Sequence, residues 1–247
     1  MAVQLEPYCG SAPAPEALLA DWNLDPVLMS AIALVAVWTW RRARAEDRLG
    51  EWALFVGLCA IAFVSPLCAL SSALFSARAF HHIILISLAA PLGWRLFSGR
   101  SIIPDRFPPM ASFVVHTVMI WLWHLPLPYA WALSGSFAYW AMETPLLLSA
   151  LWLWREILDP DRSSGSALAV CGATILQMTL LGALLTLAPR PLFSPHFLTA
   201  DLYGLSPLED QQLAGLLMWV PASLPYVFAF LLRIGQTITS SSRHGVS

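Results

Sequence analysis

Seven apolar segments, separated by short polar stretches, make up most of the chain. They lie at roughly 27–40, 52–74, 81–98, 110–127, 137–157, 167–188 and 211–232. A helix needs about 20 mostly apolar residues to cross the hydrocarbon core of a bilayer. The pattern therefore predicts an all-α polytopic membrane protein, a bundle of about seven transmembrane helices. Residues 1–26 are expected to form an external N-terminal segment, 27–233 the transmembrane domain and 234–247 a cytoplasmic tail.

Several of the segments contain proline, which bilayers tolerate where neighbouring groups satisfy the freed carbonyls. These prolines are Pro66, Pro145, Pro221 and Pro225. The last segment holds two of them and is therefore expected to be kinked. Its start is predicted by Ser206 as N-cap and Pro207 as first helical residue, followed by acidic residues.

The amino-acid composition also indicates a protein that is embedded in a lipid bilayer. The 247 residues are 58% hydrophobic and 11% charged, whereas a soluble domain carries roughly 25% charged residues. No basic run interleaved with aromatic residues is present, which argues against nucleic-acid binding. No nucleophile or phosphate-binding motif stands out, so the chain is not expected to be an enzyme.

The cysteines show no CxxC pair and suggest no disulfide framework. Cys59, Cys68 and Cys171 lie in apolar segments and are interpreted as buried small residues, whereas Cys9 lies in the polar N-terminal stretch and is interpreted as an exposed thiol.

All basic residues are arginine, and their placement predicts the orientation. With seven segments, every arginine except Arg78 and Arg190 falls on one side. Cytoplasmic loops carry the excess of positive charge. The N-terminus is therefore expected outside and the C-terminus in the cytoplasm, which requires an odd number of spans.

Polar residues at membrane depth are the candidates for function, because a centred carboxylate costs roughly 2.5–3.5 kcal/mol on insertion scales. His82 opens the third segment at its outer end, His124 ends the fourth on the same side, and Glu143 lies about two turns into the fifth. Imidazole, carboxylate and thioether ligands together suit copper. We therefore predict a shallow metal site of His82 and His124 with Glu143 and Met218 nearby. His81 and His116 are further candidate ligands.

Two other functions compete with this hypothesis. Bundles that stack two haems carry paired histidines on each of two helices, and no segment shows that spacing; one haem between His82 and His124 stays an alternative. A transport pathway would need buried charges along the whole depth of the bundle. Only Glu143 is expected to be deeply buried, so ion movement across the membrane is weakly supported.

Three stretches of the chain are similar to one known family. They are 182–193, 204–219 with Asp210, Gln211 and Trp219, and 121–129 with Trp123, His124 and Tyr129. On these stretches the chain resembles the CtaG-type cytochrome c oxidase assembly factors. The resemblance extends over roughly 52–232 and includes His82. It implies a multi-pass protein of the bacterial inner membrane, a seven-helix bundle. The implied role is to help mature a haem–copper oxidase of the respiratory chain, at the stage of copper insertion. Its partners would then be cytochrome c oxidase subunits, other copper chaperones and the lipid bilayer.

Three positions depart from the family pattern. Arg78, Tyr139 and Thr144 stand where members of the family often carry histidine. Either the site of this chain is sparser, or the protein acts by docking oxidase subunits. A copper-handling protein of the uptake or resistance type is the alternative function.

Overall fold

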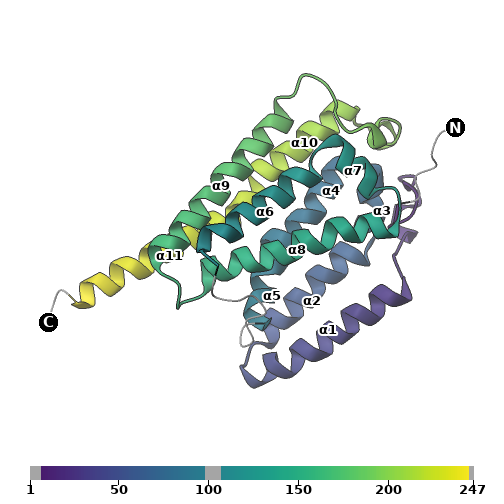
Figure 1. Ribbon diagram of the computed structural model, residues 1–247. Helices are drawn as coiled ribbons and strands as arrows, with labels where there is room; N and C mark the ends of the chain where they lie inside the picture. Colours follow the sequence, from purple (N-terminus) through teal and green to yellow (C-terminus); the bar gives the residue numbers. More distant parts are fainter. Residues whose placement is uncertain (1–6, 98–106, 245–247) are drawn as a thin grey trace.

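The computed structural model describes residues 7–97 and 107–244, with side chains to residue 239. Within these ranges the chain forms helices and turns and no strand, which confirms the all-α prediction. The long helices pack side by side as a bundle (Figure 1). Arg100 and Arg106, used in predicting the orientation, lie outside the described residues.

The helices follow the apolar segments along the chain. They are α1 (Pro26–Ala45), α2 (Leu49–Phe63), α3 (Pro66–Ala73), α4 (Phe75–His82), α5 (Ala90–Phe97), α6 (Pro109–Trp123), α7 (Pro126–Ala132), α8 (Ser136–Leu158), α9 (Ser164–Thr186), α10 (Pro207–Trp219) and α11 (Leu224–His244). A π-helical stretch, Ile83–Ala89, joins α4 to α5. Residues 234–244, expected as a tail, continue α11.

In the part of the chain that the structure describes, three helical stretches are long and apolar enough to cross a membrane: Phe75–Phe97, Ser164–Thr186 and Pro207–Thr239. Counting the bent pairs α2–α3 (42°) and α6–α7 (79°) as one span each gives up to five. The chain is therefore a multi-pass membrane protein. Helices α1 and α8 lie along the same bundle (Figure 1) but carry charged residues that lower their hydropathy, so the total of seven stays a prediction.

The predicted boundaries needed one correction that affects function. The third helical stretch begins at Phe75 and not at residue 81, because the polar Ser76 and Arg78 hide its first turn from a hydropathy count. His81 and His82 therefore lie about two turns inside the helix and are buried, rather than opening it. The predicted start of α10 is confirmed: Ser206 caps it and forms a reciprocal capping box with Glu209.

The N-terminal segment is fixed to the bundle by a disulfide bond. Cys9 and Cys68 are joined with their Cα atoms 5.3 Å apart, so the interpretations of Cys9 as an exposed thiol and Cys68 as a free core residue were wrong. Next to the disulfide, the ring of Tyr8 stacks on Tyr139 of α8 at 4.8 Å between centroids. The segment thus lies against the end of the bundle where α8 begins.

Helices α9 and α10 approach each other closely through two facing glycines. A Cβ on Gly182 would lie 2.8 Å from the carbonyl oxygen of Gly215, and one on Gly215 would lie 2.7 Å from the carbonyl oxygen of Gly182. Only glycine allows this approach, as in other close membrane helix pairs. The contact packs α10 against α9, and the first two turns of α10 carry Asp210 and Gln211.

Candidate metal centre

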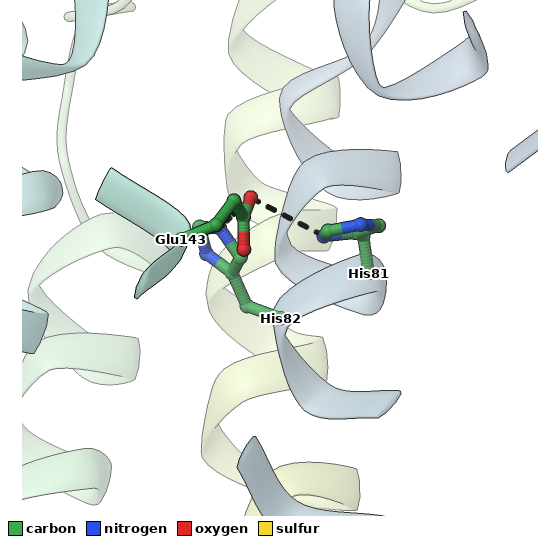
Figure 2. A group of neighbouring side chains, drawn as sticks. All are labelled: His81, His82 and Glu143. Carbon is green, nitrogen blue, oxygen red and sulfur yellow. Dashed lines mark hydrogen bonds and ion pairs between the residues drawn. The ribbon is translucent and has the colours of Figure 1, made fainter. Parts of the chain in front are cut away.

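Two histidines of α4 and one carboxylate of α8 meet inside the bundle. His82 Nε2 lies 3.2 Å and His81 Nδ1 lies 3.6 Å from Oε1 of Glu143. Figure 2 shows Glu143 reaching between the two imidazole rings. One nitrogen of each histidine and one oxygen of Glu143 lie within 4.8 Å of one another, and all three residues are buried. The group could therefore hold a metal ion.

The local helix geometry explains why adjacent histidines can share a partner. Consecutive residues of an α-helix point about 100° apart, so two neighbours can flank a side chain that enters from a facing helix. Glu143 enters in this way from α8. The π-helical stretch that follows His82 directly widens the helix there, and such π-bulges often lie at functional sites.

A guanidinium group faces the same carboxylate. Arg78 Nη1 lies 3.4 Å from Glu143 Oε1, and both side chains are 1% exposed. The guanidinium also lies over the ring of Tyr139, at 5.2 Å from its centroid. Because arginine stays protonated in proteins, Arg78 balances the charge of Glu143 at the centre of the group.

His124 stands next to His82. The centroids of the two rings are 5.8 Å apart and the rings are nearly perpendicular, at 72°. His124 Nδ1 lies 2.7 Å from the carbonyl oxygen of Ile120. A carbonyl only accepts, so Nδ1 carries the proton and Nε2 keeps its lone pair. Metal-binding histidines are commonly oriented by a backbone carbonyl in this manner.

Two features of the group fit a cation and one opposes it. His82 Nδ1 and Glu143 Oε2 are buried without a hydrogen-bond partner among the described residues, and buried polar atoms usually have one. Two imidazoles and a carboxylate suit copper or zinc better than calcium or magnesium. The guanidinium of Arg78, however, repels a cation bound to Glu143.

Asp210 holds the start of the helix that carries the histidines. Its carboxylate accepts hydrogen bonds from the backbone N–H of Phe75 (2.7 Å) and Ser76 (3.0 Å) and from the Ser76 hydroxyl (2.5 Å). A carboxylate at a helix N-terminus satisfies free N–H groups and interacts favourably with the helix dipole. Asp210 therefore positions α4 from α10, about 135 residues further along the chain.

Gln211 and Tyr129 connect the loop before α10 to the bundle. Gln211 Oε1 accepts from the N–H of Leu192 at 2.7 Å, and its Nε2 donates to the carbonyl of Leu185 at 3.3 Å. The Tyr129 hydroxyl lies 2.6 Å from Nε2 of His196, both buried. These contacts close the same end of the bundle over the histidines.

The other site residues predicted from the sequence have contacts of their own in the bundle. His116 is buried and bonds to Ser149 Oγ at 2.9 Å, about two turns along α8 from Glu143. Met218 is buried in the main apolar core. Trp123 is buried and stacks on Trp131 at 5.9 Å, and Trp219 is half-buried beside Gly182.

Two residues of this region were not proposed as site residues from the sequence. Arg78 stands four positions before His82, so the helical period alone places both on one face. Because His82 contacts Glu143, a residue on the same face of the helix is also placed near Glu143. His196 had no such signal, because its partner Tyr129 lies 67 positions away in the chain.

The fold and this group define a multi-pass helical membrane protein that encloses a buried histidine–carboxylate cluster. Residues 106–240, more than half of the chain, match the cytochrome c oxidase caa3 assembly factor family (Caa3_CtaG). The chain belongs to this family. The match includes His124, Glu143 and Asp210 and begins after α4, so His81 and His82 lie outside it. No curated protein and no solved structure matches the chain.

Proposed function

We propose that this protein helps deliver copper to a haem–copper oxidase during assembly, through the group of His81, His82, Glu143 and His124. The observation that carries the proposal is the convergence of three imidazoles and a carboxylate in one buried region of an oxidase assembly factor. Copper is the cargo here. The imidazole nitrogens would bind it. The opposite charges of Arg78 and Glu143 cancel, so the group is also stable when no copper is bound.

Two observations support an outward-facing site. The group lies on the half of the bundle that carries the Cys9–Cys68 disulfide, and disulfides persist in oxidising compartments such as the bacterial periplasm. Most described arginines lie at the other end, which favours that end as cytoplasmic. We infer that the protein sits in the bacterial inner membrane with its N-terminus outside, so that the site receives copper from the periplasm.

The proposal gives Met218, Asp210, Gln211 and the aromatic residues supporting roles. Met218 would add a soft thioether ligand from α10 if the helix shifts on binding. Asp210 and Gln211 hold the loop and α4 in place, and the buried Trp123 and Tyr129 support the same end from inside. The half-buried Trp219 would contact oxidase subunits or other copper chaperones. None of these steps requires catalysis by the protein.

The test is the His82→Ala, His124→Ala double variant in the native host. We expect lower oxidase activity and less copper in the oxidase, while the variant stays in the membrane at its normal level. His116→Ala is the matched control, because it also removes a buried imidazole but leaves the group intact. Normal oxidase spectra in the double variant would refute the role of these histidines. Altered cell copper with normal oxidase would instead indicate uptake or resistance, and a Soret band on the purified protein would indicate haem.

A further inference from the structure

A cavity lies at the end of the bundle away from the histidine group. Its volume is about 910 Å³, and it lies between the C-terminal ends of α5 and α8, the middle of α11 and the loop before α2. Along the continuous helical stretch from α4 to α5, Arg95 lies about 20 Å from His82, at a rise of 1.5 Å per residue. Figure 1 shows these helix ends on the side opposite the N-terminus.

Arginine is the most frequent residue in the wall of this cavity. Five arginines line it: Arg48, Arg95, Arg155, Arg162 and Arg233. Among the described residues, the carboxylates in the wall are Asp159 and Asp161. Beside the wall, Glu46, Glu51 and Glu156 pair with Arg48, Arg95 and Arg162, and guanidinium donors outside these pairs remain for a further anion. Guanidinium groups bind phosphate oxygens through paired, charge-assisted hydrogen bonds. The wall is therefore complementary to an anion.

In the part of the chain that the structure describes, the guanidinium group of Arg233 is positioned by neutral hydrogen-bond acceptors and not by a carboxylate. Its side chain is 7% exposed, and its hydrogen bonds within the described residues go to neutral oxygens: the carbonyls of Ile157 and Asp159 and the side-chain oxygen of Gln236. Arg48 likewise donates to the carbonyl of Arg95 at 3.0 Å, besides its ion pair with Glu46. Each guanidinium has five N–H donors, so both can also bind an anion.

A second, apolar cavity continues from the first. Its volume is about 390 Å³, and it shares Arg95, Leu158, Ala229 and Leu232 with the arginine-lined cavity. The rest of its wall is mostly apolar and includes Leu88 and Phe228, which are 40% and 65% exposed. The groove thus leads from the arginines along the surfaces of α5 and α11 that face away from the core.

We propose that the two cavities together bind one anionic phospholipid, with the phosphate among the arginines and an acyl chain in the groove. A polar anion site joined to an apolar groove matches a molecule with both parts. Basic pockets between transmembrane helices bind anionic headgroups in this manner. A free phosphate ion would use the arginines and leave the groove without a role.

The experiment measures lipid retained by the full-length protein in detergent, by native mass spectrometry, after addition of dioleoyl phosphatidylglycerol or dioleoyl phosphatidylcholine. We expect at least tenfold preference for phosphatidylglycerol. The Arg48→Gln, Arg233→Gln variant should lose the preference. Arg41→Gln is the matched control, because Arg41 is an exposed arginine at the same end that lines neither cavity.

A second variant tests the groove and leaves every arginine contact in place. Leu88→Trp should fill the groove and lower phosphatidylglycerol retention at least fivefold. Equal retention of both lipids, or equal loss in Arg41→Gln, would overturn the proposal. So would complete competition by millimolar inorganic phosphate with Leu88→Trp behaving as wild type, because the site would then be a simple anion site.

Discussion

The two ends of the bundle handle charge in opposite ways. At the histidine end, one buried carboxylate and one buried guanidinium lie 3.4 Å apart with almost no exposure, and imidazoles surround them. At the arginine end, several guanidinium groups line a cavity, and the ion pairs of Arg48 with Glu46 and of Arg95 with Glu51 are partly exposed. A buried charge is stable only when it is balanced. The histidine end therefore depends on each partner of its buried pair, whereas water screens the more exposed ion pairs of the arginine end, which depend less on each partner.

The largest expected effect follows from unbalancing the buried pair. Glu143→Gln leaves the Arg78 guanidinium buried without its carboxylate, which typically costs about 3–5 kcal/mol. We expect a corresponding loss of thermal stability of the purified protein in detergent. Glu51→Gln is the matched control: Glu51 pairs with Arg95 at 3.0 Å, but the side chains are 30% and 48% exposed, so its loss should cost below about 1 kcal/mol.

A double variant separates charge imbalance from lost packing. Arg78→Met together with Glu143→Gln removes both charges and should recover most of the stability, because well-packed neutral residues can replace a buried ion pair. Equal losses from Glu143→Gln and Glu51→Gln would show that the two ends do not differ as described.

The second prediction concerns metal affinity at the histidine end, and it rests on the proposed function. A cation at the Glu143 carboxylate would lie about 6 Å from the Arg78 charge, which costs about 3 kcal/mol at an effective dielectric constant of about 20. Arg78→His removes this repulsion and adds an imidazole one turn from His82. We expect Cu(I) affinity to rise on the order of 100-fold, measured by competition with a chromophoric Cu(I) chelator.

Arg190→His provides the control for that measurement. Arg190 is an exposed arginine in the loop before α10, so the same change of side chain there should leave Cu(I) affinity unchanged. Unchanged affinity in Arg78→His would mean that Glu143 serves the fold by pairing with Arg78 and does not bind the metal.

The sequence predicted the elements of the fold well and the pairing within the site only in part. Apolar runs located the helices, and local rules located the Ser206 cap, because both depend on neighbours in the chain. His82, His124 and Glu143 were found because polar residues are costly at membrane depth. The Arg78–Glu143 pair joins residues 65 positions apart and the Cys9–Cys68 bond residues 59 apart. Such contacts follow from helix packing, which hydropathy does not encode.

The smallest expected effect tests how the N-terminal segment closes the histidine end. The Tyr8 hydroxyl donates a hydrogen bond to Asp25 at 2.6 Å. This bond, together with the N–H of Val27, holds the pKa of Asp25 below its usual value. A depressed carboxyl pKa stabilises the docked segment above the ordinary pKa of aspartate, and this contribution is lost as the pH falls through the lower, native value.

Tyr8→Phe keeps the ring that stacks on Tyr139 and removes only the hydroxyl. The pKa of Asp25 should therefore rise toward its usual value while the helical bundle is unchanged, as measured by carboxyl carbon NMR titration between about pH 2 and pH 6. Tyr203→Phe is the control, because the Tyr203 hydroxyl bonds to the carbonyl of Pro13 instead. The same Asp25 titration in wild type and Tyr8→Phe would show that the hydroxyl does not hold the segment. Docking over the histidine end would then rest on the disulfide and the aromatic stacking.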